Sequence, residues 1–183
     1  MEDMGRLTFE TTALQDVLLI LPQPVYDSRG YFSRAFCQQE CTEAGITCQF
    51  VQDNISYNQY AGTLRGMHFQ REPYGEDKLL RCIAGEIDDI LVDLRPASPT
   101  YRKWEKYRLT ASNGRALFIP KGFAHGYITL CDHTSVYYKV SQIYHPEAAS
   151  GIRWDDPAIG IHWEKAPQII SGQDKAWPLL GQI

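Results

Sequence analysis

The segments Gly62-Thr-Leu-Arg-Gly-Met-His68-Phe-Gln70 and Pro120-Lys-Gly-Phe-Ala-His125-Gly126 say more about the architecture than any other part of the sequence. Each combines glycines with one histidine, and each overlaps a run of residues typical of a β-strand. A single histidine is more often structural than catalytic, and we expect only surface or packing roles for His133, His145 and His162. His68 and His125 differ because they lie on separate predicted strands, in glycine-containing motifs with charged residues in line with them.

Short runs typical of β-strands, separated by turn residues, recur along the chain. They cover residues 16–21, 31–36, 49–53, 63–69, 78–83, 87–94, 106–109, 116–119, 126–130 and 135–140. Many short strands at close spacing predict an all-β sandwich or barrel. One helix is expected at residues 38–44, ended by Gly45, and short helical pieces are expected from Asp156 onward.

The run at residues 87–94 has two different faces, because side chains alternate along a strand. Ile90, Val92 and Leu94 share one face, and Asp89, Leu91 and Asp93 share the other. The face that carries Asp89 fits the polar interior of a barrel that holds a ligand, and it fits a solvated outer surface equally well.

The composition is that of an ordinary globular protein, with 183 residues, 44% apolar residues and a net charge of −4. This length fits one domain, residues 1–183. Lysines and arginines form no basic run, so general nucleic-acid binding is not expected. The first ten residues lack the apolar core of a secretory signal, and the longest aliphatic run, residues 17–21, is too short to span a membrane.

Five cysteines, at positions 37, 41, 48, 82 and 131, form no Cys-x-x-Cys pair. An odd number of cysteines without a secretory signal indicates reduced thiols and a cytoplasmic protein. A zinc site made by Cys37, Cys41 and Cys48 is the alternative, but their spacing matches no common zinc motif.

The two histidine segments resemble the two cupin signatures, in which Gly is followed after five residues by His, and Pro-x-Gly-x-x-His follows later. Metal-binding cupins continue the first signature with a second His and then a Glu. Here Gln70 takes the place of the second His, and Tyr74 and Gly75 stand where the Glu is expected. Amide oxygens are weak ligands for transition metals, so no metal is predicted and the histidines are available for proton transfer.

Further motifs follow one another through almost the whole chain. They are Asp27-Ser-Arg-Gly-Tyr31, Phe50-Val-Gln-Asp-Asn54, Lys78-Leu-Leu-Arg81, Val92-Asp-Leu-Arg95, Ser98-Pro-Thr100, Tyr138-Lys139 and Ser171-Gly-Gln-Asp174. Together with the histidine segments they resemble the dTDP-4-dehydrorhamnose 3,5-epimerase family. The resemblance implies a cupin jelly roll, or double-stranded β-helix, that forms a homodimer and needs no cofactor. It also implies a nucleotide-sugar substrate with a ketone at C4, most simply dTDP-4-dehydro-6-deoxyglucose in rhamnose-type deoxysugar biosynthesis.

The resemblance also assigns roles by position. His68 matches the family's catalytic base, Asp174 its carboxylate partner, and Tyr138 the general acid on the opposite face of the sugar. Lys78 and His125 match residues near the C4 oxygen and the sugar. Five further residues match family positions that contact the nucleotide and pyrophosphate or lie beside them: Arg29, Gln52, Asn54, Arg65 and Tyr144.

These residue types suit the chemistry, because removal of a hydrogen next to a ketone leaves an enolate. The reaction needs a base on one face, an acid on the other and a positive group at the carbonyl oxygen. A neutral imidazole is available as a base near pH 7, a carboxylate fixes its tautomer, and a lysine stabilises the enolate. Guanidinium groups such as those of Arg29 and Arg65 bind phosphate oxygens through paired donors.

The residues alone suggest plainer roles for three of these positions. Lys78 would be a solvated strand end, and Asp174 a cap or turn residue. Tyr138 would be an amphipathic strand residue, with the neighbouring Tyr137 as the better core candidate. The pairing of Asp174 with His68 therefore rests on the resemblance.

One position departs from the resemblance, since Arg34 stands where many such epimerases have Glu. This change leaves the nucleotide and the sugar open. The alternatives are an epimerase of C3 only or C5 only, for example on a CDP-linked sugar, and a nucleotide-sugar ketoisomerase. A metal-dependent cupin oxygenase and a non-catalytic cupin that binds sugar nucleotides are the alternatives from other classes.

Overall fold

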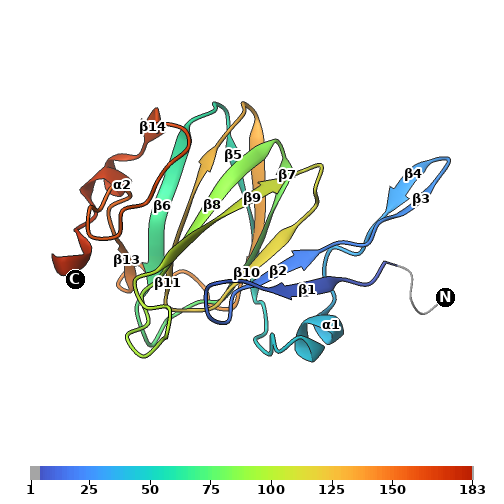
Figure 1. Cartoon of the computed structure of the whole chain (residues 1–183), viewed down its shortest axis with the longest axis horizontal. Helices are drawn as coiled ribbons and strands as arrows, with labels where there is room; N and C mark the ends of the chain where they lie inside the picture. Colours follow the sequence, from blue (N-terminus) through green and yellow to red (C-terminus); the bar gives the residue numbers. More distant parts are fainter. Residues whose placement is uncertain (1–4, 183) are drawn as a thin grey trace.

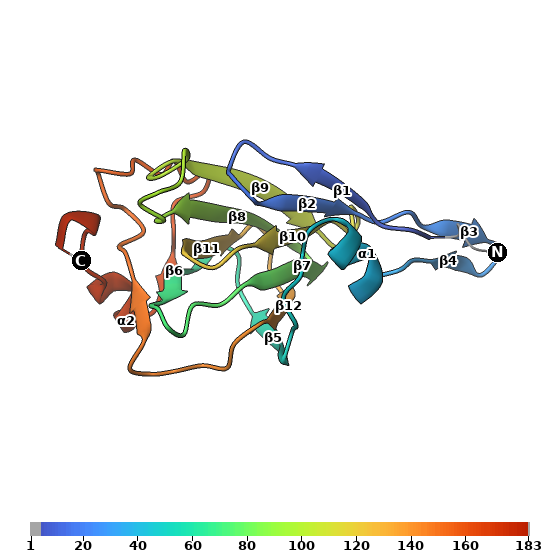
Figure 2. The same ribbon diagram turned by 90° about the horizontal axis from the view of Figure 1, so that it is seen from below.

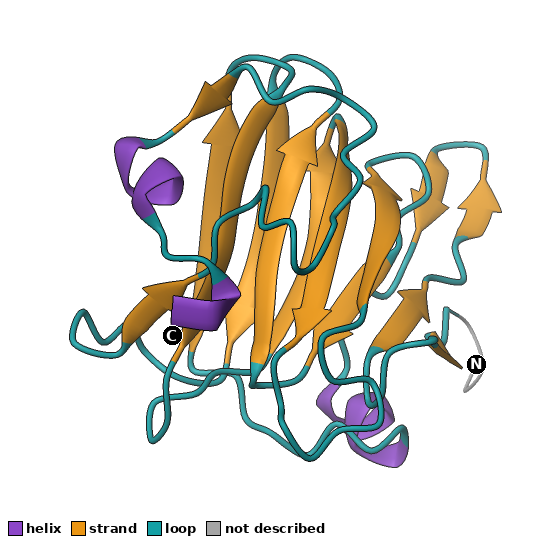
Figure 3. Cartoon of the chain, turned by 60° about the vertical axis from the view of Figure 1, so that its left-hand side comes forward, coloured by secondary structure: helices purple, strands orange, loops and turns teal. Residues whose placement is uncertain are grey.

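The computed structural model describes residues 5–182, and strands make up most of its regular structure (Figures 1 and 3). The strands are β1 (Thr8–Thr11), β2 (Leu18–Leu21), β3 (Val25–Asp27), β4 (Gly30–Phe32), β5 (Gln52–Asn58), β6 (Thr63–Gln70), β7 (Lys78–Ala84), β8 (Glu86–Asp93), β9 (Trp104–Thr110), β10 (Ala116–Ile119), β11 (Phe123–Thr129), β12 (Thr134–Val140), β13 (Ala149–Gly151) and β14 (Ile169–Ile170). The helices are α1 (Gln38–Glu43), α2 (Gly172–Ala176) and the 3₁₀ turn η1 (Leu180–Gln182).

Two sheets face each other. One has the order β1-β2-β10-β7-β12-β5, and the other has the order β13-β6-β11-β8-β9, with β14 added to β6. Strands β5, β7, β10 and β12 lie in the first sheet and β6, β8, β9 and β11 in the second, which is the arrangement of an eight-stranded jelly roll, and their pairs are antiparallel. The predicted all-β jelly roll with a few short helices is confirmed.

The space between the sheets is filled by apolar side chains from both of them. Leu91 of β8 packs in the same cluster as Leu80, Leu117 and Val136 of the opposite sheet. The face of β8 that carries Asp89 therefore points inward. The other face, with Ile90, is not solvated either, because the C-terminal segment covers it.

The core prediction for β12 is wrong. The hydroxyl of Tyr137 donates to Asp53 at 2.8 Å on the outer face of the sheet, whereas Tyr138 packs against the core cluster. Alternation along the strand explains the result, since Tyr138 shares its face with Val136 and Val140, both of which are buried.

Several boundaries also differ from the prediction. The predicted strand at residues 49–53 lies mostly before β5, and only residues 31–32 of the predicted strand at residues 31–36 belong to a strand, the second one of the hairpin β3–β4. Strands β1, β3, β13 and β14 were not expected. The helix at residues 38–44, followed by Gly45 with a φ of +91°, and the short C-terminal helices agree with the prediction.

Glycines of the two histidine segments meet where β6 and β11 pair. A Cβ atom on Gly66 would lie 2.5 Å from the Cα of Gly126, and Gly66 also has a φ of +129°. A Cβ atom on Gly126 would lie 2.8 Å from the backbone oxygen of Arg65. These positions need glycine because the backbones approach too closely for any side chain.

The hairpin β3–β4 extends away from the two sheets, at the end opposite α2 (Figures 1 and 2). Its large side chains are exposed, with Tyr26 at 72%, Tyr31 at 65% and Phe32 at 70%.

Among the described residues, no helix is long and apolar enough to cross a membrane. The five cysteines are all free.

Candidate active site

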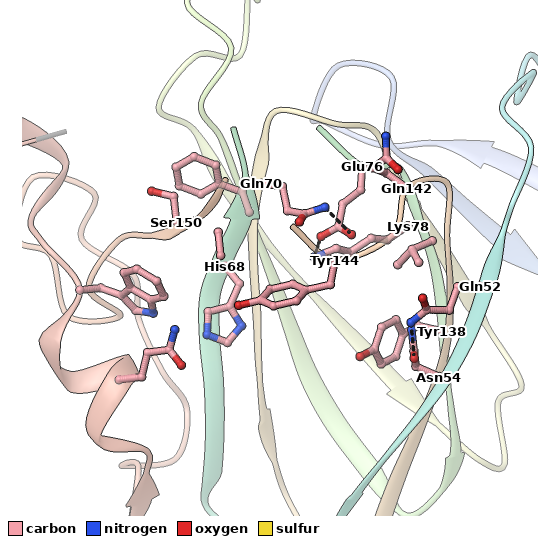
Figure 4. A pocket seen from close by; sticks show the side chains of 15 residues that line it. Gln52, Asn54, His68, Gln70, Glu76, Lys78, Tyr138, Gln142, Tyr144 and Ser150 are labelled. Atoms are coloured by element: carbon pink, nitrogen blue, oxygen red, sulfur yellow. Dashed lines mark hydrogen bonds and ion pairs between the residues drawn. The ribbon is translucent and has the colours of Figure 1, made fainter. Parts of the chain in front are cut away.

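A cavity of about 390 Å³ opens between the two sheets beside the C-terminal segment. Its walls include Gln52, Asn54, His68, Gln70, Glu76, Lys78, Tyr138, Tyr144, Ser150, Gln173 and Trp177 (Figure 4). A second cavity of about 230 Å³ shares His68, Lys78 and Tyr138 with the first, and it adds Arg65, His125 and Tyr127. Sites for small organic molecules commonly measure about 300–1,000 Å³, so the combined space suits a nucleotide sugar in size.

His68, on β6, is paired with Asp174 although the two residues lie far apart in the sequence. The Nε2 atom of His68 lies 2.5 Å from Oδ1 of Asp174. An ionised carboxylate only accepts hydrogen bonds, so Nε2 carries the hydrogen and Nδ1 keeps its lone pair. Burial favours a higher pKa for Asp174, but the hydrogen bond and charge of His68 outweigh it and hold that pKa below its usual value.

The short helix α2 brings Asp174 to this place. Ser171 caps the helix, because its hydroxyl accepts the backbone N–H of Asp174 at 3.0 Å. The Asp174 carboxylate also accepts from the backbone N–H of Gly66 and from Nε1 of Trp177, both at 3.3 Å. The Trp177 ring stands edge-on to the His68 imidazole, with ring centroids 6.0 Å apart. Asp174 is thus held from three directions.

A second histidine–aspartate pair lies beside the neighbouring cavity, which His125 lines. Nε2 of His125 lies 2.7 Å from Oδ2 of Asp89, whose side chain is completely buried. The other carboxylate oxygen, Oδ1, is a buried atom without a hydrogen-bond partner among residues 5–182. Burial raises the pKa of Asp89, while the His125 imidazole acts against that rise. His125 is paired directly with His68 across β11 and β6.

Tyr138 and Lys78 come from the opposite sheet. In Figure 4, His68 lies on one wall of the cavity and Tyr138 on the other, with the ring of Tyr144 between them in this view. Burial raises the pKa of Tyr138, so its phenol keeps its proton at neutral pH. Lys78 is not a solvated strand end, because its side chain is only 13% exposed and its Nζ lies 3.0 Å from Glu76.

Most of the expected nucleotide-binding residues lie at the same cavities. Gln52 and Asn54 are neighbours on β5, joined by a hydrogen bond of 2.8 Å. Arg65 reaches the second cavity, where its Nε donates to Asn58 at 2.8 Å. Tyr144 forms part of the first cavity's wall and is 63% exposed.

Arg29 is the exception among the predicted site residues. It lies at the turn of the hairpin β3–β4, its side chain is 87% exposed, and it pairs with Asp27. It lines neither of the two cavities. Arg34, which stands in place of the usual Glu, forms an ion pair with the buried Glu40 of α1. Within its own chain, this side chain therefore joins the base of the hairpin to the helix.

Three side chains that contact the predicted ones were not among the predicted site residues. Glu76 lies beside Lys78, Asp89 beside His125, and Trp177 beside His68. The alternation along residues 87–94 singled out the face with Asp89 without deciding whether it points inward, and the alternation of side chains near Lys78 could have identified Glu76. No local signal marked Trp177. Among the residues that the structure describes, no group of three or more His, Cys, Asp or Glu side chains is arranged to hold a metal ion.

A family model described as dTDP-4-dehydrorhamnose 3,5-epimerase matches residues 11–182. The chain belongs to this family. The dTDP-4-dehydrorhamnose 3,5-epimerase of Methanothermobacter thermautotrophicus is 47% identical over 181 residues, which cover 97% of this chain and 96% of the relative. The family predicted from the motifs is thus confirmed, and with it the isomerase class of enzyme.

Solved structures of dTDP-4-dehydrorhamnose 3,5-epimerases share the fold. The Bacillus anthracis enzyme, with TDP and PPi bound, superimposes with a TM-score of 0.93 at 42% identity, covering 96% of this chain and 100% of the other. The Legionella pneumophila dTDP-6-deoxy-D-glucose-3,5-epimerase, in complex with dTDP-4-keto-L-rhamnose, gives a TM-score of 0.92 at 38% identity, covering 97% and 95%.

Proposed function

We propose that this chain inverts C3 and C5 beside the C4 ketone of a nucleotide-linked 4-keto-6-deoxyhexose. The most direct substrate is dTDP-4-dehydro-6-deoxyglucose, which places the enzyme in rhamnose-type deoxysugar biosynthesis. The observation that carries the proposal is a base of fixed tautomer, His68, on the wall opposite a protonated phenol, Tyr138. The ligands named for the two solved relatives support the choice of substrate.

In the first step His68 removes the hydrogen on the carbon next to the ketone. Nδ1 is the atom that accepts this proton, because Nε2 is engaged by Asp174. The imidazolium that forms is stabilised by the ionised Asp174 carboxylate. The C–H electron pair moves into the ring and the ketone oxygen becomes an enolate oxygen.

In the second step Tyr138 returns a proton to the same carbon from the opposite face, which inverts the centre. Lys78 and His125, which line the second cavity, would stabilise the enolate oxygen, and Asp89 would orient His125. His68 then releases its proton and Tyr138 is reprotonated by solvent before the next centre reacts. Acid–base catalysis of this kind contributes about 10²–10⁴-fold, and binding and enolate stabilisation supply the rest.

The nucleotide end binds at the cavity mouth in this proposal. Arg65 would contact phosphate oxygens, and Gln52, Asn54 and Tyr144 would contact the nucleotide or lie beside it. Arg29 reaches a cavity only if the hairpin of one subunit lies against a second subunit. We therefore propose a homodimer, because exposed aromatic side chains on an extended hairpin are typical of a surface that a partner covers.

The reaction and the assembly are tested separately. Incubation with dTDP-4-keto-6-deoxyglucose in heavy water, followed by NMR, should place deuterium at C3 and C5. His68→Ala should abolish the exchange, and Tyr138→Phe should permit exchange but impair inversion. Full epimerisation by His68→Ala would refute the role of that residue. Deuterium at only one of the two carbons would mean that the enzyme inverts a single centre. Activity on a CDP-linked substrate tests whether Arg34 changes the preference for the nucleotide. Sedimentation tests the homodimer and should give twice the mass of one chain.

Two further parts of the proposal concern the whole chain. We propose that residues 1–183 form one domain, because the family model spans residues 11–182 and the site uses residues from β5 to α2. We also propose that the reaction takes place in the cytoplasm, where free thiols stay reduced.

A further inference from the structure

Gln70, the last residue of β6, is only 5% exposed and lies in the wall of the cavity. Its side-chain oxygen accepts the backbone N–H of His145 at 2.6 Å. Its side-chain nitrogen donates to the backbone oxygens of Ile143 and Tyr74, both at 3.1 Å. One amide thus connects β6 to two loops, residues 71–77 and residues 141–148.

The two hydrogen bonds to the second loop lie on either side of Tyr144. Ile143 and His145 are its immediate neighbours in the chain, so Gln70 fixes the backbone before and after this residue. The loop has a second support, since the His145 ring stacks on the Tyr74 ring with centroids 3.8 Å apart and planes at 18°. Tyr144 itself is 63% exposed and lies over the cavity (Figure 4).

We propose that Gln70 is a positioning residue that holds the Tyr144 loop across the cavity mouth and so preforms the binding site for the nucleotide part of the substrate. The proposal rests on the proposed function, which assigns the cavity mouth to the nucleotide. A loop that is already ordered costs less free energy when the ligand binds. Where metal-binding cupins place a metal-ligating histidine, this chain uses an amide to organise a loop.

Glutamine suits this position because the task needs an acceptor and two donated hydrogens on one planar group. Glutamate has the same shape but only accepts, so it would keep the contact to the N–H of His145 and lose both donations. Its negative charge would face the backbone oxygens of Ile143 and Tyr74. It would also lie near the Glu76 carboxylate, which is 3.5 Å from the Gln70 nitrogen. Gln70→Glu is therefore a selective probe of the loop contacts.

The test compares Gln70→Glu and Gln70→Ala with Gln59→Glu, which adds the same charge at an exposed residue just beyond β5. Hydrogen exchange, measured by mass spectrometry on the ligand-free protein, should be at least about fivefold faster in peptides covering residues 141–148 of both Gln70 variants. The dissociation constant of dTDP and the KM of the nucleotide sugar should rise about 10- to 100-fold, while kcat changes by less than about threefold. Gln59→Glu should match the parent protein in each measurement.

Combination with Tyr144→Ala shows whether Gln70 acts through Tyr144. If it does, adding Gln70→Glu to Tyr144→Ala should weaken dTDP binding by less than about twofold further. Unchanged exchange in the loop, a loss confined to kcat, or fully multiplicative effects in the double variant would each overturn the proposal. Lack of epimerisation by the parent protein would instead overturn the proposed function, since loop exchange and dTDP binding are measured without turnover.

Discussion

The Asp174 carboxylate offers the sharpest test of how this site works, through the substitution Asp174→Asn. The change keeps the size of the side chain but removes the charge beside Nε2 of His68, at present 2.5 Å from Oδ1. Asp174 is only 4% exposed, so water cannot readily replace the lost interaction. The expected effect therefore falls on the imidazolium that forms when His68 takes a proton.

The magnitude follows from two contributions. A hydrogen bond to a charged group is worth about 1.5–3 kcal/mol, which corresponds to a rate loss of roughly 10- to 150-fold at about 1.4 kcal/mol per factor of ten. If the asparagine turns its NH₂ group toward Nε2, the hydrogen of the imidazole moves to Nδ1 and the base loses its lone pair. This change of tautomer extends the loss to about 10⁴-fold. We expect the deuterium exchange rate to fall by roughly 10²–10⁴-fold.

The assay is solvent deuterium exchange into the nucleotide sugar, followed by NMR at saturating substrate. Asp155→Asn is the matched control, because Asp155 forms a 40% exposed ion pair with Arg153 away from the cavity. Asp174 also accepts hydrogen bonds from Gly66 and Trp177, so thermal unfolding must be measured to separate lost catalysis from lost structure. An Asp174→Asn protein that is folded and exchanges deuterium within about threefold of the parent rate would refute the reasoning.

Three other predictions concern the enolate, acid stability and packing. Lys78→Met should lower kcat/KM by about 10²–10³-fold without unfolding the protein, as steady-state kinetics and circular dichroism would show, because it removes the cation that we propose stabilises the enolate oxygen. Asp93 is completely buried; burial alone favours a higher pKa, but hydrogen bonds from Arg95, Ser98 and Thr100 lower it to about 2. The ionised Asp93 therefore contributes about 2–3 kcal/mol to the free energy of unfolding above about pH 4, and this contribution is lost as the pH falls through about 2. Asp93→Asn should unfold at a lower urea concentration at pH 7, and its stability should fall less steeply than that of the parent protein as the pH is lowered. Gly126→Ala should destabilise the protein by at least about 3 kcal/mol in urea unfolding, because the added Cβ meets the backbone oxygen of Arg65 at 2.8 Å, and an unchanged midpoint would contradict that contact.

The strand pattern predicted a sandwich or barrel and the resemblance made it a jelly roll; the strand assignments were good where the inner face is apolar and failed where it lines a cavity. In β5 the side chains toward the cavities are Gln52, Asn54 and Ser56, whereas Ile55 and Tyr57 are 68% and 55% exposed. This reversed alternation disguises the strand, since apolar residues normally mark the core side. The same polar face provides much of the candidate site.

The site itself was only partly predictable. Glycine-containing motifs identified His68 and His125, and resemblance supplied Asp174, but spacing in the sequence gives no distance between residues on separate elements. Asp89 was named with Asp93 on one face of its predicted strand, but the sequence left open whether that face points inward and did not reveal the bond to His125. The predicted contact of Arg29 with the substrate cannot be made to the cavities of its own chain, because the hairpin that carries Arg29 lies away from both of them.

The location of Asp174 on α2 also bears on how activity arises during synthesis. Strands β5 to β12, which make the walls of the jelly roll, are all complete at Val140, and the ribosome delivers α2 only afterwards. A chain that ended before α2 would keep His68 but lack its carboxylate partner. The pair of His68 and Asp174 therefore depends on α2 packing against β6, which is possible only after the strands of the jelly roll have been synthesised.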